Sequence, residues 1–166
     1  MIQRKISGGA GGKFDENGWE GYKNGFGDKK EGDFWLGLEK IHQMTLNGNW
    51  KIMFKIRGTN GGSVVMIWNN FKVSSEDEEY RLSCGAKAEN WGDYSVYSSS
   101  SNLASHDGAM FSTKDRDNDL YSGGGNCAKT NRGGFWYTKS SSCYYLIPPT
   151  KAYSSYRETK MLIAPM

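Results

Sequence analysis

The chain has 166 residues, a size typical of one domain, and only 37% of them are hydrophobic. Its longest apolar run, Val64–Trp68, is far too short to cross a bilayer, which excludes membrane insertion. The 21 Lys and Arg residues exceed the 18 Asp and Glu residues by only three and form no basic stripe, so we expect no nucleic-acid partner for this single domain over residues 1–166.

Two short helices are predicted after a first strand at Ile2–Ile6. The segment Trp19–Asn24 carries aromatic residues on one side, and Gly25 follows it as a stop signal. The segment Leu38–Leu46 carries an apolar stripe at helical spacing. Both patterns predict amphipathic helices of about two turns.

Strands are predicted in the middle of the chain, where the periodicity changes. Apolar and polar residues alternate from Trp50 to Arg57, which is typical of a half-buried strand. The turn Gly58–Gly62 and the apolar run Val64–Trp68 complete a hairpin. Two shorter β runs are expected at Asn69–Val73 and Tyr80–Cys84.

A long polar stretch, Ala86–Thr130, has neither helical nor strand periodicity. So many irregular residues are unusual in a compact domain unless something orders them. Order returns at Phe135–Tyr137 and in a closing strand at Tyr156–Ile163. We therefore predict an α+β fold with a central, twisted, mostly antiparallel sheet, short helices and a large loop region.

The acidic loop, residues Asp115–Gly125, is the candidate for ordering that region. Alternating carboxylates on a turn can converge on one point, and oxygen ligands with carbonyls from a glycine-rich bend suit calcium. The loop is not an EF-hand, because Leu120 stands where the turn glycine belongs and Asn126 where the bidentate Glu belongs. The alternative is a solvated turn whose Asp and Asn side chains cap local amides.

Signatures of catalysis and of thiolate metal sites are missing. His106 adjoins Asp107, but adjacent loop residues rarely face each other as a catalytic triad requires. We therefore predict that the chain is not an enzyme. The three cysteines, Cys84, Cys127 and Cys143, contain no Cys-x-x-Cys pair, and they leave open one disulfide with a free thiol, a bridge between chains, or three buried thiols.

Several longer motifs occur in the order that one known family shows. They are Trp19–Gly27, Asp33–His42, His106–Asp119, Asn126–Ala128, Gly133–Tyr137 and the tail Thr159–Pro165. These segments resemble the fibrinogen C-terminal globular domain, which fibrinogen, ficolins, tachylectins, angiopoietins and tenascins share. The resemblance covers nearly the whole chain and implies the family's fold. It also implies that the family's N-terminal subdomain is absent from this chain.

The resemblance implies a calcium site in the acidic loop. The matching ligands are the side chains of Asp117 and Asp119 and the main-chain carbonyls of Tyr121 and Gly123. Two extra glycines before Asn126 leave the second carbonyl open within the run 123–125. Calcium is thus the expected cofactor and the expected source of order in the loop region.

The resemblance also implies a disulfide between Cys127 and Cys143. Because disulfides persist in oxidising compartments, this pairing implies a secreted, extracellular protein. Cys84 has no counterpart in the family, so it is either free or links two chains, and a homo-oligomer is left open.

The function that the resemblance implies is recognition without catalysis. We expect lectin-like binding of acetylated glycans near Trp136, Tyr137 and Tyr144, where aromatic walls could hold a methyl group. Core packing is the alternative role for these rings. The alternative function is a protein-binding module of the fibrinogen or angiopoietin type, because the loops after Cys143 that usually build the glycan pocket are shortened.

Overall fold

The computed structural model describes residues 1–6, 12–30, 32–93, 102–138, 143 and 156–166. Within these residues the centre of the fold is a seven-stranded sheet of order β2-β3-β1-β9-β4-β5-β8, in which every pairing is antiparallel. Its strands are β1 (Gln3–Ile6), β2 (Phe26–Gly27), β3 (Phe34–Trp35), β4 (Trp50–Gly58), β5 (Ser63–Trp68), β8 (Lys87–Gly92) and β9 (Tyr156–Pro165). A separate two-stranded sheet consists of β6 (Lys72–Val73) and β7 (Leu82–Ser83).

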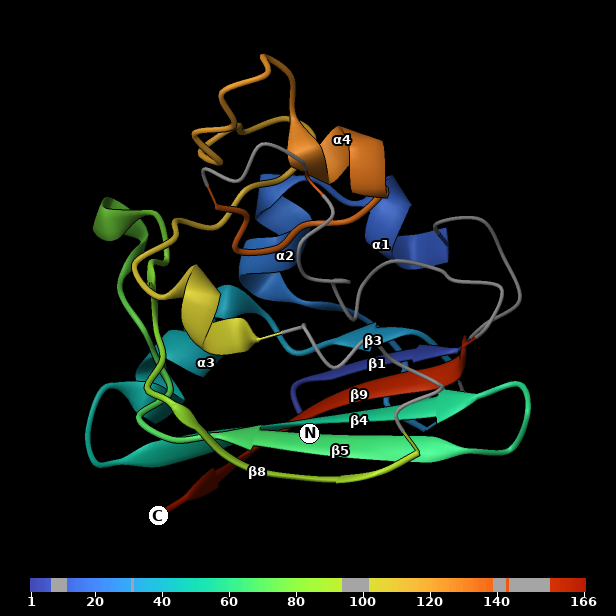
Figure 1. The fold of residues 1–166 in the computed structure, drawn as a ribbon. Coiled ribbons are helices and arrows are strands. Elements are labelled where there is room, and N and C mark those ends of the chain that lie inside the picture. Colours follow the sequence, from blue (N-terminus) through green and yellow to red (C-terminus); the bar gives the residue numbers. More distant parts are fainter. Residues whose placement is uncertain (7–11, 31, 94–101, 139–142, 144–155) are drawn as a thin grey trace.

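The helices are short and lie on one side of the large sheet (Figure 1). They are α1 (Gly12–Glu16), α2 (Trp19–Asn24), α3 (Leu38–Thr45) and α4 (Cys127–Asn131), with 3-10 turns at Glu76–Glu78 and Leu103–His106. No helix in the described part of the chain is both long and apolar enough to span a membrane. The architecture is the expected α+β fold, with a sheet on one side and helices and loops on the other.

Alternation along β4 fixes which side of the sheet is the core. Ile52, Phe54 and Ile56 are buried, and the residues between them are half-buried or exposed. Phe54 lies directly opposite Met66 of β5 and Met161 of β9, and both methionines are buried in the same core. The strand period of two therefore separates an inner apolar face from an outer face.

The core between the sheet and the loops is built largely from rings. The ring centroid of Phe111 lies 5.1 Å from Trp136, 5.4 Å from Tyr22 and 5.9 Å from Trp35. The Tyr22 hydroxyl accepts a hydrogen bond from the Gly134 backbone N–H at 2.7 Å, and burial raises the pKa of Tyr22. A Cβ at Gly134 would lie 2.8 Å from the Phe111 ring, so a larger residue would displace this packing.

The sequence predicted the long elements well. The segments α2, α3, β4, β5 and β9 appear with bounds close to those expected, and the turn at 58–62 closes a hairpin through the Gly58 N–H and the Gly62 carbonyl. The two shorter β runs are reduced to the two-residue strands β6 and β7. At Phe135 only an isolated bridge to Ser112 forms.

The prediction that Ala86–Thr130 lacks regular structure was wrong at both ends. Strand β8 pairs with β5, but its residues are mostly exposed, so no apolar alternation marks it. Helix α4 begins after Asn126, whose side chain caps the Lys129 N–H at 2.9 Å. That N-cap was the available sequence signal, and a five-residue helix is too short to show a period.

Candidate functional site

The acidic loop is fixed to the helical part of the core through Asp115. Thr113 and Arg116 exchange backbone hydrogen bonds of 2.9 and 3.2 Å, which closes the turn. Asp115 Oδ1 accepts the Trp19 backbone N–H at 2.9 Å and the Thr113 hydroxyl at 2.7 Å. Burial acts to raise the pKa of Asp115, but these hydrogen bonds hold the pKa below its ordinary value. The carboxylate thus joins the loop to the first turn of α2.

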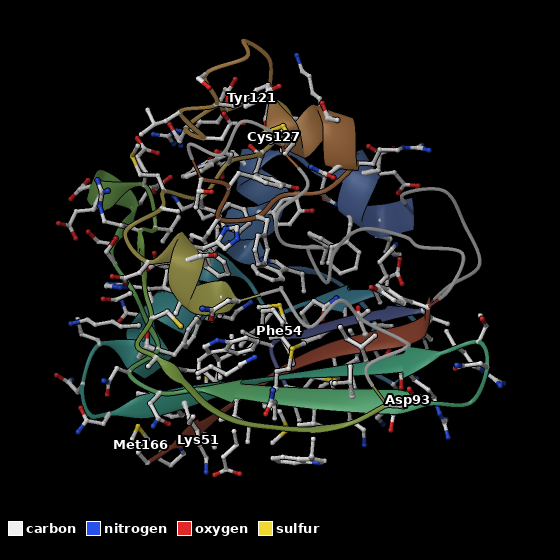
Figure 2. The ribbon with its side chains drawn as sticks, in the orientation of Figure 1. Lys51, Phe54, Asp93, Tyr121, Cys127 and Met166 are labelled. Carbon is white, nitrogen blue, oxygen red and sulfur yellow. A yellow bond between two sulfur atoms is a disulfide. The ribbon has the colours of Figure 1, made fainter. Side chains whose placement is uncertain are left out.

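Asp119 fixes the other end of the loop to α4. Its side chain is only 3% exposed; Oδ1 accepts the Tyr121 N–H at 2.8 Å and Oδ2 accepts the Cys127 N–H at 2.7 Å. Figure 2 shows Tyr121 and Cys127 at the end of the molecule away from the large sheet. A disulfide joins Cys127 to Cys143, as expected, and the Asn131 side-chain amide donates to the Cys143 carbonyl at 3.0 Å.

Asp117 is exposed, as is Asp115, but it accepts fewer hydrogen bonds than the other two aspartates of the loop. It accepts one long hydrogen bond, 3.4 Å from the Asp119 N–H. Partial burial and the neighbouring Asp119 carboxylate raise the pKa of Asp117. Capping of local amides therefore accounts for Asp115 and Asp119, whereas Asp117 is held next to a second negative charge with little compensation.

The oxygen donors around Asp117 suit a hard cation. Among the described residues no three carboxylate, imidazole or thiolate side chains gather in one place. A metal here would therefore depend on main-chain carbonyls in addition to the carboxylates of Asp117 and Asp119. The carbonyls of Tyr121 and Gly123 follow directly in the chain, and carboxylates with carbonyls are the donors that calcium prefers. The types of donor in this segment therefore match those of a calcium site.

A cavity of about 270 Å³ opens beside the acidic loop. Its lining residues are Arg81, Ser105, Asp107, Gly108, Ala109, Met110, Asn118, Asp119, Leu120, Tyr137 and Thr138. Leu120 is 59% exposed and has a positive φ of 55°, so this apolar side chain stands out from the loop. The volume is just below the range of ordinary ligand pockets and suits one side chain or one small substituent.

The three aromatic residues predicted to hold a ligand separate in the structure. Trp136 is fully buried, and its indole N–H donates to the Tyr80 carbonyl at 2.7 Å, so its prediction as a ligand wall was wrong and it is a core residue. Tyr137 is largely buried, and its hydroxyl donates a hydrogen bond to the Gly133 carbonyl at 2.7 Å. It nevertheless lines the cavity. Tyr144 lies outside the described residues.

His106 and Asp107 do not form a catalytic pair. The His106 ring is buried, its Nδ1–H donates to the Trp136 carbonyl at 2.7 Å, and burial lowers the pKa of His106, which favours the neutral ring. Within the described part of the chain its Nε2 has no hydrogen-bond partner. Asp107 instead accepts the Cys84 N–H at 2.8 Å. The Cys84 thiol is buried and forms no disulfide within the chain.

The residues that line the cavity were mostly not predicted. Arg81, Asp107 and Leu120 come from three separate segments of the chain, and no local pattern relates them. Leu120 offered the best signal, because it is a lone apolar residue in a run of acids, serines and glycines. A single exposed leucine is normal on a protein surface, and what distinguishes Leu120 is that it also lines the cavity.

Comparison with known proteins gives a consistent result. The model of the C-terminal globular domain of fibrinogen beta and gamma chains matches residues 1–161. Human angiopoietin-related protein 2 is 38% identical over 137 residues, which are 82% of this chain and 25% of that protein. Human ficolin-3 is 35% identical over 126 residues, 76% of this chain and 38% of that protein. This chain therefore spans only a quarter to two fifths of these relatives.

A solved structure shows the same architecture. The fibrinogen-like globe domain of human ANGPTL2 superposes with a TM-score of 0.75 at 30% identity, covering 99% of this chain and 78% of that one. The likeness extends over the sheet, the helices and the loop region together.

Proposed function

The chain belongs to the family of fibrinogen C-terminal globular domains, and on that premise we propose that it is an extracellular recognition domain that binds a protein or peptide partner. The cavity beside the acidic loop carries this proposal. Its lining combines charges of both signs, from Arg81 and Asp107, with the exposed apolar side chain of Leu120. An apolar anchor among polar groups is typical of protein interfaces.

Binding of an acetylated glycan is the second candidate. The burial of Trp136 removes one of the aromatic walls on which that function depends, and this favours a protein partner. Tyr137 still lines the cavity, which is the observation that keeps a glycan in consideration. An extracellular setting is supported by the Cys127–Cys143 disulfide, since such bonds persist in oxidising compartments.

Calcium is part of the proposal. Asp117 and Asp119 would hold it by their side chains, and Tyr121 and a carbonyl of the run 123–125, first of all Gly123, by the main chain. Bound calcium would neutralise the negative charges of the two neighbouring carboxylates. The loop that carries Leu120 would then be held in one conformation, which lowers the entropic cost of binding a partner.

A calcium titration by calorimetry tests the metal site. Asp117→Asn is the informative variant, because Asp117 is exposed and contributes only one long hydrogen bond to the fold. The matched control is Asp77→Asn, which removes one exposed carboxylate from the 3-10 turn at Glu76–Glu78. We expect the heat of calcium binding to disappear only in Asp117→Asn. Equal heats in all three proteins would refute the site.

Selection from a display library of linear peptides tests the partner class. Peptides enriched on the wild-type chain in calcium should lose binding to Leu120→Arg, which fills the cavity mouth with a charged side chain. The control is Leu46→Arg, another exposed leucine, at the end of α3. Retention on N-acetylglucosamine resin, released by free acetate, together with no enriched peptide, would favour the glycan instead.

A further inference from the structure

The outer face of the large sheet is a second surface, separate from the acidic loop. Residues of β4 alternate between the two faces, and Figure 2 shows Phe54 directed into the core and Lys51 on the opposite side. Figure 1 places α1, α2 and α4 on the core side. None of the described helices covers the outer face, so the side chains there are available to a ligand.

Basic residues lie directly opposite one another across three neighbouring strands of this face. Lys55 of β4 pairs with Lys160 of β9, and Lys160 pairs with Arg4 of β1. Arg57 stands two residues along β4 from Lys55, on the same face. Since adjacent strands lie about 5 Å apart, the three cations of the row follow each other at that spacing.

A β-bulge adds a fifth basic residue to this face. The pairing of β4 with β9 passes from Arg57↔Glu158 to Gly58↔Tyr156, which leaves Arg157 without a partner on β4. Strict alternation after Glu158 would direct Arg157 toward the core. Instead Arg157 is exposed and lines a hollow of about 180 Å³ together with Arg4 and Arg57. Bulges commonly redirect a side chain in this way.

The outer cationic patch, defined as Arg4, Lys55, Arg57, Arg157 and Lys160, is poorly neutralised. Its single carboxylate, Glu158, accepts from Arg4 Nε at 2.7 Å and from Lys160 Nζ at 2.9 Å. Five cations and one carboxylate sum to +4, compared with +3 for the whole chain, so the remaining residues sum to −1. Within the described residues no ion pair forms at the other three cations.

Repulsion among the cations of the patch lowers the stability of the fold unless an anion is bound there. Like charges directly opposite each other in a sheet, such as Lys55 and Lys160, are destabilising. Departures of this kind from a rule of stability are expected at functional or strained sites. The hollow on the other side of Glu158, of about 210 Å³, is lined by Lys55, Arg57 and Lys160 and gives the anion a second point of attachment.

We propose that the outer cationic patch binds a sulfated polysaccharide. Sulfate groups spaced along a chain match cations that are fixed on rigid strands, and arginine can grip an oxyanion with two parallel hydrogen bonds. No described aromatic ring lines either hollow, so neither hollow offers the stacking platform that single-stranded nucleic acids require. The exposed Trp91 of β8 lies two strands away from Lys55, across Val65. The disulfide favours the extracellular space, where sulfated polysaccharides are available.

Titration of the full chain with a heparin octasaccharide tests this proposal. Wild-type affinity should fall linearly with the logarithm of the salt concentration. The double variant Arg57→Ala with Arg157→Ala should weaken binding at least tenfold. It should also make the slope of log affinity against log salt concentration shallower, by the equivalent of about two ionic contacts. The matched control, Lys72→Ala with Lys129→Ala, removes the same charge from β6 and α4 and should change affinity less than twofold.

A gain in affinity provides the sharper test. Glu158→Gln removes the one carboxylate of the patch and should tighten octasaccharide binding severalfold, a result that loss of folding cannot produce. The proposal is overturned if both double variants weaken binding equally, or if Glu158→Gln leaves it unchanged. Equally tight binding of desulfated heparin, of single-stranded DNA of matched charge or of phosphatidylserine vesicles would also overturn it. Calcium heats and peptide selection concern the other surface, so their outcomes are independent of this one.

Discussion

The large sheet and the acidic loop are held together by different kinds of bond. Strand β4 is paired by backbone hydrogen bonds on both sides, with β5 and with β9, so its order depends on the main chain and on alternating apolar side chains. The acidic loop is held chiefly by side chains that accept backbone amides, above all those of Asp115 and Asp119. A single substitution can therefore free several amides in the loop, whereas in the sheet it mainly changes packing.

The ring cluster around Phe111 joins these two regions, and its removal should have the largest effect. Phe111 is fully buried between the loop side and Trp35 of β3. Phe111→Ala should lower the free energy of unfolding by about 3 to 5 kcal/mol. Urea unfolding followed by far-UV circular dichroism measures this free energy of unfolding. The control is Leu120→Ala at an exposed position, whose free energy of unfolding should lie within about 0.5 kcal/mol of the wild-type value. If Phe111→Ala changed only the loop and not the sheet, the two regions would unfold independently.

Loss of the disulfide should come next and should affect the two regions unequally. Cys127 and Cys143 are 16 residues apart, and a closed loop of that size is worth about 3 kcal/mol. In Cys127→Ser with Cys143→Ser, hydrogen exchange should accelerate most in α4 and the acidic loop and least in β4. Cys84→Ser, which removes the free buried thiol, is the control. Uniform acceleration through β4 would show that the loop region has no separate stability.

Replacement of Asp119 by Asn should have a smaller effect that stays local to the loop. An amide offers one acceptor oxygen where the carboxylate offers two, so the N–H of either Tyr121 or Cys127 loses its partner. The expected loss is about 1 to 3 kcal/mol in the free energy of unfolding. Amide exchange at these two residues, read by NMR, should quicken while β4 stays protected. Unchanged exchange at both would mean that Asp119 does not anchor the loop.

The difference between the periodic sheet and the irregular acidic loop explains which parts of the structure could be predicted from the sequence. Alternation predicted β4, β5 and β9 because a sheet with one buried face imposes a period of two on residues such as Ile52 and Phe54. The carboxylates of the acidic loop were identified by composition, and the resemblance selected Asp117 and Asp119 among them. Neither showed that Asp115 and Asp119 would cap backbone amides while Asp117 accepts a single long hydrogen bond. Trp136 was misassigned for a related reason: burial of a ring depends on partners distant in the chain.

The smallest effect is a pH dependence of opposite sign at two aspartates of one loop. The pKa of Asp115 is lowered by its hydrogen bonds, so Asp115 stabilises the fold above its ordinary pKa and this contribution is lost as pH falls through the lowered value. The pKa of Asp117 is raised by partial burial and by Asp119, so ionisation of Asp117 opposes folding, and its penalty appears as pH rises through the raised value.

In EDTA at neutral pH, Asp115→Asn should therefore lower the midpoint of urea unfolding, and Asp117→Asn should raise it slightly. Both differences from wild type should shrink toward about pH 3, where the carboxylates become protonated. In added calcium the midpoint of urea unfolding of Asp117→Asn should instead fall below that of the wild type. Only the wild-type chain then binds the cation, and a ligand that binds the folded state stabilises it in proportion to its affinity. A stabilising Asp117→Asn in both EDTA and calcium would mean that Asp117 is an uncompensated charge and has no role in binding a metal.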